Sequence, residues 1–523
     1  MEKKSLSHMG PFSRSTWRII FSILMLFLVI CAISPSYSIQ NDTFYVIKIG
    51  EHFLDHGIDL VDHWAWSAQI EITYPHFLLN IILAVLYRTL GLDSIYVFVL
   101  LIGYLLALSM YYISEKVYDM TVGKEDNSLY PLVGFLVSMI IMGIFPSFIV
   151  ARSQLLTFPL WLWEMWFIIR LLNTGLKRYG AGIIVFSRLC ALTHATAWYF
   201  TFILFIPFFA TVYFTKLKKY LSSKNINLDS VLYFEKIIFS TENECHNVKK
   251  LWVVLLLSYA TGLLTPTRIC YTSVFKIGGG NPVKYIAEFE PLSTSNAAVI
   301  FICVFLLVFL LLFFRVKCRL DFLFLFIGTF AMALISFRHV GLLSSVSCYA
   351  LFYVIFDALR QIPTKIRENR INSIVLFLLI PVFALCGLKY NNFSYFTLLN
   401  PSWVSVDAMD YIEENYDTET LKLFNDYNFG AYMLFRDIPV FIDSRVNEYT
   451  KQFNPGLTRD VFDDYVAVAK LQNNWRDVVT YYDFDGYFIQ KTGPLFQYLS
   501  SCPDVELVWE DDNTAIFMTK KKS

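Results

Sequence analysis

The residue types that can do chemistry are concentrated between positions 42 and 76. Four of the eight histidines lie between His52 and His76, among several carboxylates and two tryptophans. Carboxylates and imidazoles act as general acids and bases, and indole rings stack on the flat faces of sugars. The candidates in this stretch are Asp42, Asp62 and His76 for catalysis, and His63, Trp64 and Trp66 for substrate binding.

Asp42 is the candidate general base. A predicted helix begins at Asn41 or Asp42 and ends at Gly57. The partial positive charge at a helix N-terminus favours an ionised carboxylate, which can accept a proton. Asp42 can instead serve only as the helix cap, and Trp64 and Trp66 can instead be anchors in the membrane interface. The apolar side chains of the helix suit a position in that interface.

No metal site is predicted. His52 and His56 are four residues apart and can share one face of a helix, as metal-binding histidines do. The sequence has no HExxH motif, and it indicates no third ligand for this pair. We therefore predict no metal ion here, and we leave a divalent metal cofactor open.

The composition indicates which solvent surrounds the elements that hold these residues. Of the 523 residues, 56% are hydrophobic and only 16% are charged, which is typical of a protein embedded in lipid. The formal net charge is zero, and this excludes a strongly basic nucleic-acid-binding protein. The nine cysteines are scattered without a CxxC motif, so neither a zinc ribbon nor a disulfide framework is indicated. The predicted fold class is mainly α, a polytopic transmembrane helix bundle.

About eleven apolar segments are predicted to cross the membrane, since a crossing helix needs about 20 residues. The first, residues 19–33, follows a basic N-terminus without a signal-peptide cleavage site, which places the N-terminus in the cytoplasm. Residues 180–214 are too long for one straight helix, and we expect one crossing plus a short re-entrant or interfacial piece there. The other segments are residues 75–90, 95–113, 129–145, 155–172, 251–264, 297–314, 320–336, 341–359 and 372–388.

The predicted topology divides the chain into two parts of opposite charge. Residues 1–388 form the transmembrane bundle, with a net charge of +9 and basic loops that favour the cytoplasmic side. Residues 36–74 form its first outer loop. An odd number of crossings places residues 389–523 outside the cytoplasm, and their 21 acidic and 12 basic residues sum to −9. Lys177 and Arg178 fit this topology badly, because simple alternation places them outside.

Residues 389–523 are predicted to form a small extracytoplasmic α/β domain. Asp443 and Arg445 directly follow a predicted strand, where α/β domains place ligand-binding loops. Residues 425–427 follow the preceding strand in the same manner, so the two loops share one edge if the strands are neighbours. The predicted strands are residues 420–424, 440–442, 486–490, 505–509 and 514–519, and the predicted helices are residues 405–415, 455–470, 475–483 and 494–501.

The order of several motifs resembles that of the GT-C superfamily of membrane glycosyltransferases. The resemblance is closest to bacterial members related to protein O-mannosyltransferases and ArnT. An Asp-Thr-Phe triplet at residues 42–44 follows the first span, and Trp66-Ser67 and then Tyr74-Pro75-His76 precede the second. Further similar segments contain Arg152, His194, Glu288, Arg338 with His339, and the tail residues 424–432 and 440–445.

The resemblance implies that the protein moves a sugar from a polyprenyl-phosphate donor to a glycan, lipid or protein acceptor at the outer face of the membrane. Guanidinium groups suit the phosphate because they bind it in a bidentate manner. The implied roles are Asp42 as base; Arg152, Arg338 and His339 as ligands of the donor phosphate; and His194, Glu288, Asp443 and Arg445 as substrate-binding residues.

Several of these residues also have simpler interpretations. Arg338 and His339 can be a snorkelling pair at the end of a span. His194 can be a hydrogen-bonded structural histidine, and Glu288 can be a solvated charge on an outer loop. Each role therefore depends on whether the fold brings the side chain to a shared site.

Two other classes of protein fit parts of the sequence. A transporter or lipid flippase places charged residues in mid-span, at the interface of internal repeats. Only Glu164 and Arg188 lie in mid-span here, and no internal repeat is evident. A non-catalytic envelope assembly protein, with the acidic tail as its binding surface, is the remaining alternative. The prediction is a membrane glycosyltransferase.

Overall fold

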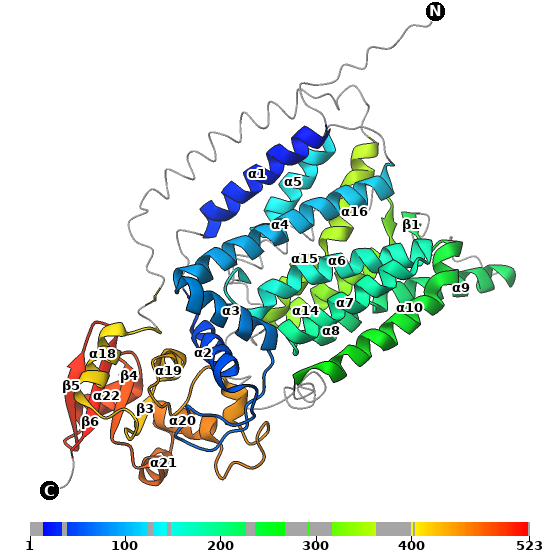
Figure 1. The fold of residues 1–523 in the computed structure, drawn as a ribbon. Helices are drawn as coiled ribbons and strands as arrows, with labels where there is room; N and C mark the ends of the chain where they lie inside the picture. Colours follow the sequence, from blue (N-terminus) through cyan, green and yellow to red (C-terminus); the bar gives the residue numbers. More distant parts are fainter. Residues whose placement is uncertain are drawn as a thin grey trace, which may run out of the picture.

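The structure is a computed structural model that describes residues 14–33, 39–123, 129–143, 148–225, 236–266, 291, 316–361, 399–400 and 403–520. Long helices form a bundle, and residues 403–520, called the tail below, lie at one end of it (Figure 1). The predicted mainly α fold is confirmed. The predicted boundary between residues 388 and 389 lies outside the described residues.

The bundle contains helices long and apolar enough to cross a membrane. Among the described residues these are Asp93–Thr121, Ser153–Thr174, Trp198–Ser223 and Glu242–Leu264, with a fifth if Phe337–Val346 and Cys348–Arg360, bent by 42°, form one broken span. The bundle helices are α1 (Arg14–Ile33), α4 (Asp93–Thr121), α5 (Leu129–Met142), α6 (Ser153–Thr174), α7 (Lys177–Thr193), α8 (Trp198–Ile203), α9 (Ile206–Ser223), α10 (Glu242–Ala260), α14 (Leu320–Ile335), α15 (Val340–Val346) and α16 (Cys348–Arg360).

Short elements complete this part of the chain. They are the 3₁₀ helices η4 (Thr261–Leu264) and η7 (Phe337–His339) and the paired strands β1 (Ile237–Ile238) and β2 (Cys318–Arg319). The number of about eleven crossings stays a prediction, because the predicted segments 297–314 and 372–388 lie outside the described residues.

Helices α1 and α4 are antiparallel neighbours. Arg18, near the start of α1, forms an ion pair with Glu115, near the end of α4. Further along the pair, the Tyr104 hydroxyl donates a hydrogen bond to the Ser22 carbonyl oxygen at 3.1 Å. One more membrane crossing between α1 and α4 would make these two helices parallel. The segment between them therefore returns to the side of the bundle from which it started.

That segment contains α2 (Asn41–His56) and α3 (Phe77–Leu90), which lie between the bundle and the tail (Figure 1). Helix α3 has 14 residues, about 21 Å, and is shorter than the hydrocarbon core of about 30 Å. Near its end, the Tyr87 ring lies 5.2 Å from the ring of Phe435 in the tail. The prediction that residues 75–90 cross the membrane is therefore wrong. One face of the helix, with Leu79 and Leu83, packs on protein.

The short re-entrant or interfacial piece predicted within residues 180–214 is not observed, and the number of crossings there stays a prediction. This stretch forms two long helical pieces, α7 and the α8–α9 pair, separated by a turn that begins at His194. Trp198, at the start of the second piece, donates from Nε1 to the Ser187 hydroxyl of the first at 3.2 Å. The first piece has 17 residues and the second, Trp198–Ser223, has 26, so neither is a short interfacial segment.

Helix α2 is packed tightly between protein elements. A Cβ at Gly50 would lie 2.0 Å from the Asn80 carbonyl oxygen of α3, so this close crossing requires glycine. Phe44 and Ile47 are fully buried, and the Phe44 ring lies 4.9 Å from that of Tyr432 in the tail. The apolar face of α2 was predicted to lie in the membrane interface, and the structure buries it against α3 and the tail instead.

The tail contains a mixed four-stranded sheet in the order β3-β4-β6-β5. Strand β3 is parallel to β4, and the other neighbours are antiparallel. The strands are β3 (Leu423–Asn425), β4 (Gly486–Gln490), β5 (Val505–Glu510) and β6 (Thr514–Thr519). The helices are α18 (Val406–Asn415), α19 (Tyr427–Phe435), η9 (Val446–Tyr449), α20 (Val461–Ala469), α21 (Trp475–Tyr482) and α22 (Pro494–Ser501). The predicted bounds of β4, β6 and α22 match the structure.

Residues 440–442 are not the strand that the sequence predicts. Val440 forms an isolated parallel bridge with Ala65 of the first outer loop. The Asn425 side chain takes the place of a ladder partner, accepting from the Phe441 backbone N–H at 2.7 Å. A Cβ at Gly430 of α19 would lie 2.0 Å from the Ile442 carbonyl oxygen. The two tail motifs therefore pack against each other. This packing positions the next residues, 443–448, toward the bundle.

Candidate active site

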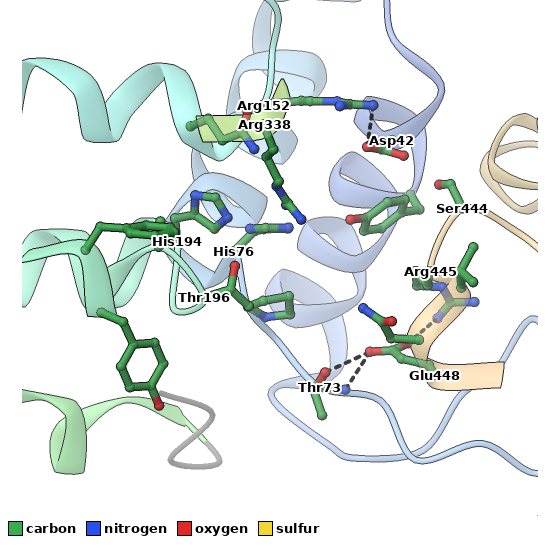
Figure 2. A pocket seen from close by; sticks show the side chains of 18 of the residues that line it. Asp42, Thr73, His76, Arg152, His194, Thr196, Arg338, Ser444, Arg445 and Glu448 are labelled. Atoms are coloured by element: carbon green, nitrogen blue, oxygen red, sulfur yellow. Dashed lines mark hydrogen bonds and ion pairs between the residues drawn. The ribbon is translucent and has the colours of Figure 1, made fainter. Parts of the chain in front are cut away.

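A cavity of about 620 Å³ lies where the start of α2, the ends of several bundle helices and the tail meet. Figure 2 shows His76 and His194 on one wall and Ser444, Arg445 and Glu448 of the tail on another. The predicted site residues that line the cavity are Asp42, His76, Arg152, His194, Arg338, His339 and Arg445. Elements distant in sequence thus bring seven of the predicted residues together.

Asp42 and Arg152 form an ion pair at the mouth of this site. Asp42 lies in the first turn of α2, whose N-cap is Gln40, so its carboxylate is not the helix cap. The Arg152 guanidinium, at the N-cap of α6, approaches the carboxylate at 2.9 Å (Figure 2). The two side chains remain 27% and 26% exposed, so a substrate can reach both of them.

Three residues from the ends of bundle segments form the inner wall. The rings of His76, before α3, and His194, after α7, lie 5.2 Å apart. Arg338, after α14, reaches into the cavity beside them (Figure 2). Within the described part of the chain, His194 is 3% exposed and neither of its ring nitrogens has a hydrogen-bond partner, and Nδ1 of His76 has none either. The interpretation of His194 as a hydrogen-bonded structural histidine is therefore not supported by the described residues.

His339 lines the cavity from the same turn as Arg338. Its Nδ1 lies 3.0 Å from the Met332 carbonyl oxygen, and its ring packs edge-on against Phe200 at 5.3 Å. With Nδ1 held by the backbone, only the opposite side of the ring is available to a ligand.

The tail supplies Glu448, which the sequence analysis did not select. Its Oε1 accepts hydrogen bonds from the backbone N–H and the hydroxyl of Thr73, each at 2.9 Å. Among the described residues, Oε2 has no hydrogen-bond partner, and Nη1 of Arg445 lies 3.8 Å from it. Burial raises the pKa of Glu448 to about 7, so the carboxyl group exchanges a proton near neutral pH.

Asp62 and Asp443 do not line the cavity but hold Arg445, which does. Nη1 of Arg445 lies 2.5 Å from Oδ1 of Asp62, and Nη2 lies 2.5 Å from Oδ2 of Asp443. The Tyr449 hydroxyl donates to the same Asp443 oxygen at 2.5 Å. The other oxygen of Asp62 accepts the Ala65 backbone N–H at 2.6 Å. Both carboxylates are fully engaged, and they tie the first outer loop to the tail.

The aromatic candidates of the outer loop also lie outside the cavity lining. Trp64 packs under the Arg445 guanidinium at 5.6 Å, and Trp66 packs against Phe441 in the tail at 5.5 Å. His63 is bonded to Asp59 at 2.9 Å. Trp64 and Trp66 thus pack against tail residues near the cavity without lining it. Glu288, the last of the predicted substrate-binding residues, lies outside the described residues.

The cavity has other walls that sequence reasoning did not identify. Its polar residues beyond the predicted set include Tyr45, Thr73, Thr196, Tyr199, Tyr427, Asn447 and Glu448, and its apolar wall includes Phe158, Trp161, Phe200 and Leu342. Glu448 follows Arg445 by three residues in a polar run after the tail motif, which is the only signal in the sequence that could have identified it.

Solved structures with the same fold are GT-C membrane glycosyltransferases. The archaeal oligosaccharyltransferase AglB from Archaeoglobus fulgidus, in complex with an inhibitory peptide and a dolichol-phosphate, matches with a TM-score of 0.57 and 12% identity over 91% of this chain and 69% of that chain. ArnT from Cupriavidus metallidurans, bound to undecaprenyl phosphate, matches with a TM-score of 0.53 and 11% identity over 97% of this chain and 98% of that chain. No family model and no curated protein matches the sequence.

The predicted resemblance to GT-C proteins is therefore confirmed at the level of the fold. At 11–12% identity the comparison concerns the path of the chain, and it extends over the tail as well as the bundle. The cavity described above carries the argument for function.

Proposed function

We propose that this protein is an integral-membrane glycosyltransferase that moves a sugar from a polyprenyl-phosphate-linked donor to an acceptor at the extracytoplasmic face, with Asp42 as general base. The observation that carries the proposal is the partly exposed Asp42–Arg152 pair in a cavity that also contains Arg338. The acceptor is a glycan, lipid or protein. The AglB structure contains a dolichol-phosphate and the ArnT structure an undecaprenyl phosphate, which supports a donor of this class.

The reaction needs one proton transfer and one bond exchange. An acceptor hydroxyl gives its proton to the Asp42 carboxylate while its oxygen bonds to the anomeric carbon of the sugar. The bond from that carbon to the donor phosphate breaks, and its electron pair leaves with the phosphate oxygen. Protonation of Asp42 removes the negative partner of Arg152, so this guanidinium becomes available to the departing phosphate together with Arg338.

The buried polar atoms of the inner wall suit a sugar. His194 offers ring nitrogens without a partner among the described residues, and the Oε2 atom of Glu448 is an acceptor of the same kind. Burying such groups costs free energy unless a ligand bonds them. A sugar hydroxyl can donate to Glu448 and accept from an imidazole N–H, so both groups are satisfied when the substrate is bound.

The apolar wall suits the lipid part of the donor. Phe158 and Trp161 of α6 and Phe200 of α8 line the cavity on the bundle side. A polyprenyl chain needs an apolar groove next to the phosphate site. These rings line the same cavity as Arg152 and Arg338, the proposed phosphate ligands. The donor phosphate then sits at the boundary between lipid and the polar cavity.

The corrected path of the chain supports placing the cavity outside the cytoplasm. The cavity gathers the start of α6 and the end of α7, so the turn between these helices, with Lys177 and Arg178, lies at the far end of the bundle. Lys177 and Arg178, which fitted the predicted topology badly, then lie on the same cytoplasmic side as the other basic loops. In a Thr174→Cys variant, the introduced cysteine should react only with a labelling reagent applied from the cytoplasmic side. Labelling only from outside would overturn this orientation.

A transporter or flippase remains the alternative, and the cavity favours the transferase. Its charged residues gather where the ends of helices meet the tail, whereas transporters bind substrate in the middle of broken helices. Glu164, a mid-span charge of α6, is fully buried and does not line the cavity.

The test is transfer of labelled sugar from polyprenyl-phosphate sugars by the purified full chain and by Asp42→Asn. Loss of a general base lowers the rate about 10²- to 10⁴-fold. Asp55→Asn, on the same helix but paired with Arg88 outside the cavity, is the matched control and should retain transfer. Full activity in a correctly folded Asp42→Asn protein would refute Asp42 as the base. Absence of transfer by the wild type with every such donor would favour the other two classes.

A further inference from the structure

A second cluster of chemically active side chains lies outside the cavity, at the far end of α2. It consists of His52 on α2 and Asp59 and His63 on the first outer loop, and we refer to it as the loop triad. One ligand atom from each residue lies within 4.8 Å of the others. We propose that the loop triad binds a divalent transition-metal ion of the zinc class.

The geometry brings two imidazoles onto one carboxylate oxygen. Nε2 of His52 lies 3.0 Å from Oδ2 of Asp59, and Nε2 of His63 lies 2.9 Å from the same oxygen. The rings of His52 and His63 are 4.7 Å apart. In a tetrahedral zinc site with bonds of about 2.0 to 2.1 Å, neighbouring ligand atoms are about 3.4 Å apart. The two imidazole–carboxylate distances must therefore lengthen by a few tenths of an ångström to admit the ion, and the three ligand atoms already lie within 4.8 Å of one another.

The surrounding residues hold the carboxylate in position. Tyr74, which is 2% exposed, donates its hydroxyl to the backbone carbonyl oxygen of Asp59 and lies 3.3 Å from Oδ1. This contact occupies the side of the carboxylate away from the imidazoles and leaves Oδ2 facing them. Trp64, 9% exposed, packs edge-on against the His52 ring at 5.7 Å and shields that side. Metal sites commonly orient their carboxylate ligands through such outer contacts.

The types of ligand decide which ions fit. Two imidazoles with one carboxylate suit Zn²⁺, Co²⁺, Ni²⁺ or Fe²⁺, whereas Mg²⁺ and Ca²⁺ prefer oxygen ligands alone. The side chains of Asp59 and His63 are 39% and 44% exposed, so an ion can enter from solvent. His56, which the sequence paired with His52, stacks on the His52 ring at 4.9 Å instead of joining the three ligand atoms.

A bound ion would connect helix α2 to the outer loop. His52 belongs to α2, which carries Asp42, and the outer loop that contains Asp59 continues to Asp62 and Thr73. Those two residues bond Arg445 and Glu448 at the cavity wall. An ion on the loop triad would join the rigid helix to the loop that holds the tail side of the cavity in place. The inference stands on this geometry and does not depend on the proposed reaction.

The experiment uses the full chain without a polyhistidine tag, stripped with a chelator and titrated with Zn²⁺ and with Co²⁺ as a spectroscopic probe. The wild type should bind one zinc ion and give the intense visible absorption of four-coordinate Co²⁺. Asp59→Asn and His63→Ala should each weaken binding at least about tenfold. His246→Ala, which removes an exposed histidine of α10, should bind as the wild type does.

Two outcomes would overturn the inference. One is a wild-type protein that binds no zinc at micromolar concentrations. The other is unchanged zinc affinity in both Asp59→Asn and His63→Ala. Thermal unfolding of the metal-free proteins identifies a variant that fails to fold, and two variants at different ligands keep the test decisive. Zn²⁺ should raise the unfolding temperature of the wild type and leave that of Asp59→Asn unchanged.

Discussion

Asp42–Arg152 and Asp62–Arg445 are carboxylate–arginine pairs of the same chemistry in different surroundings. Asp42 and Arg152 are 27% and 26% exposed and face a cavity. Asp62 and Arg445 are 1% and 4% exposed, and Asp443 holds Arg445 as well. A substrate can reach the first pair, whereas the second pair is bonded to other protein groups. Residue type alone therefore does not distinguish the two pairs, whereas the position of the carboxylate does, because Asp42 lines the cavity and Asp62 does not.

The largest expected effect on stability comes from the buried pair. Arg445→Ala leaves Asp62 and Asp443 buried without their cation, and removal of one partner of a buried ion pair costs about 3 to 5 kcal/mol. Thermal unfolding of the purified protein should show a large decrease in the midpoint. An unchanged midpoint would mean that the outer loop and the tail do not depend on this contact.

The matched variant of the exposed pair is Arg152→Ala. Partly exposed ion pairs contribute about 0 to 1 kcal/mol, so its unfolding midpoint should stay close to that of the wild type. Sugar transfer, by contrast, should fall in Arg152→Ala. If Arg152→Ala and Arg445→Ala lowered stability equally, the distinction between a reacting pair and a structural pair would fail.

An intermediate effect is expected from Glu448, which is buried but keeps one oxygen without a hydrogen bond among the described residues. Burial raises its pKa from the ordinary 4.5 to about 7. Between about pH 4.5 and pH 7 the folded protein holds a proton that the unfolded chain has released, so stability falls as the pH rises through this window. The total loss is about 3 kcal/mol.

Unfolding midpoints measured across this pH range test the Glu448 prediction. Glu448→Gln cannot ionise and keeps an oxygen for Thr73, so its midpoint should decline less with rising pH than that of the wild type. Parallel declines in the two proteins would show that another group causes the pH dependence.

Much of the tail and of the bundle could be predicted from local patterns. Short strand-like runs that alternate with helix-like runs identified β4, β6 and α22 with their observed bounds. Residues 440–442 look like a strand in the sequence, yet their partner is the side chain of Asn425 instead of a neighbouring strand. Local propensity cannot distinguish these cases, because a strand exists only when another backbone pairs with it.

The differences at residues 75–90 and 180–214 have one physical cause. Hydropathy reports that a segment avoids water, and it does not report whether lipid or protein covers it. Helix α3 is apolar and packs one face on α2 and the tail, and hydropathy alone counted it as a crossing. Residues 180–214 were counted once because no polar stretch marks the turn at His194. The total number of crossings stays a prediction.

The sequence by itself determined that the chain is mainly helical and built for lipid, that Asp42 begins a helix after the first apolar segment, and which arginines and histidines were candidates. These are properties of composition and short-range spacing. Only the tertiary structure decided that His194 and Arg338 meet Asp42, that Glu448 joins them, and that Asp62 serves Arg445 instead. The reason is that a cavity is formed by segments far apart in sequence, and their proximity depends on how whole helices pack.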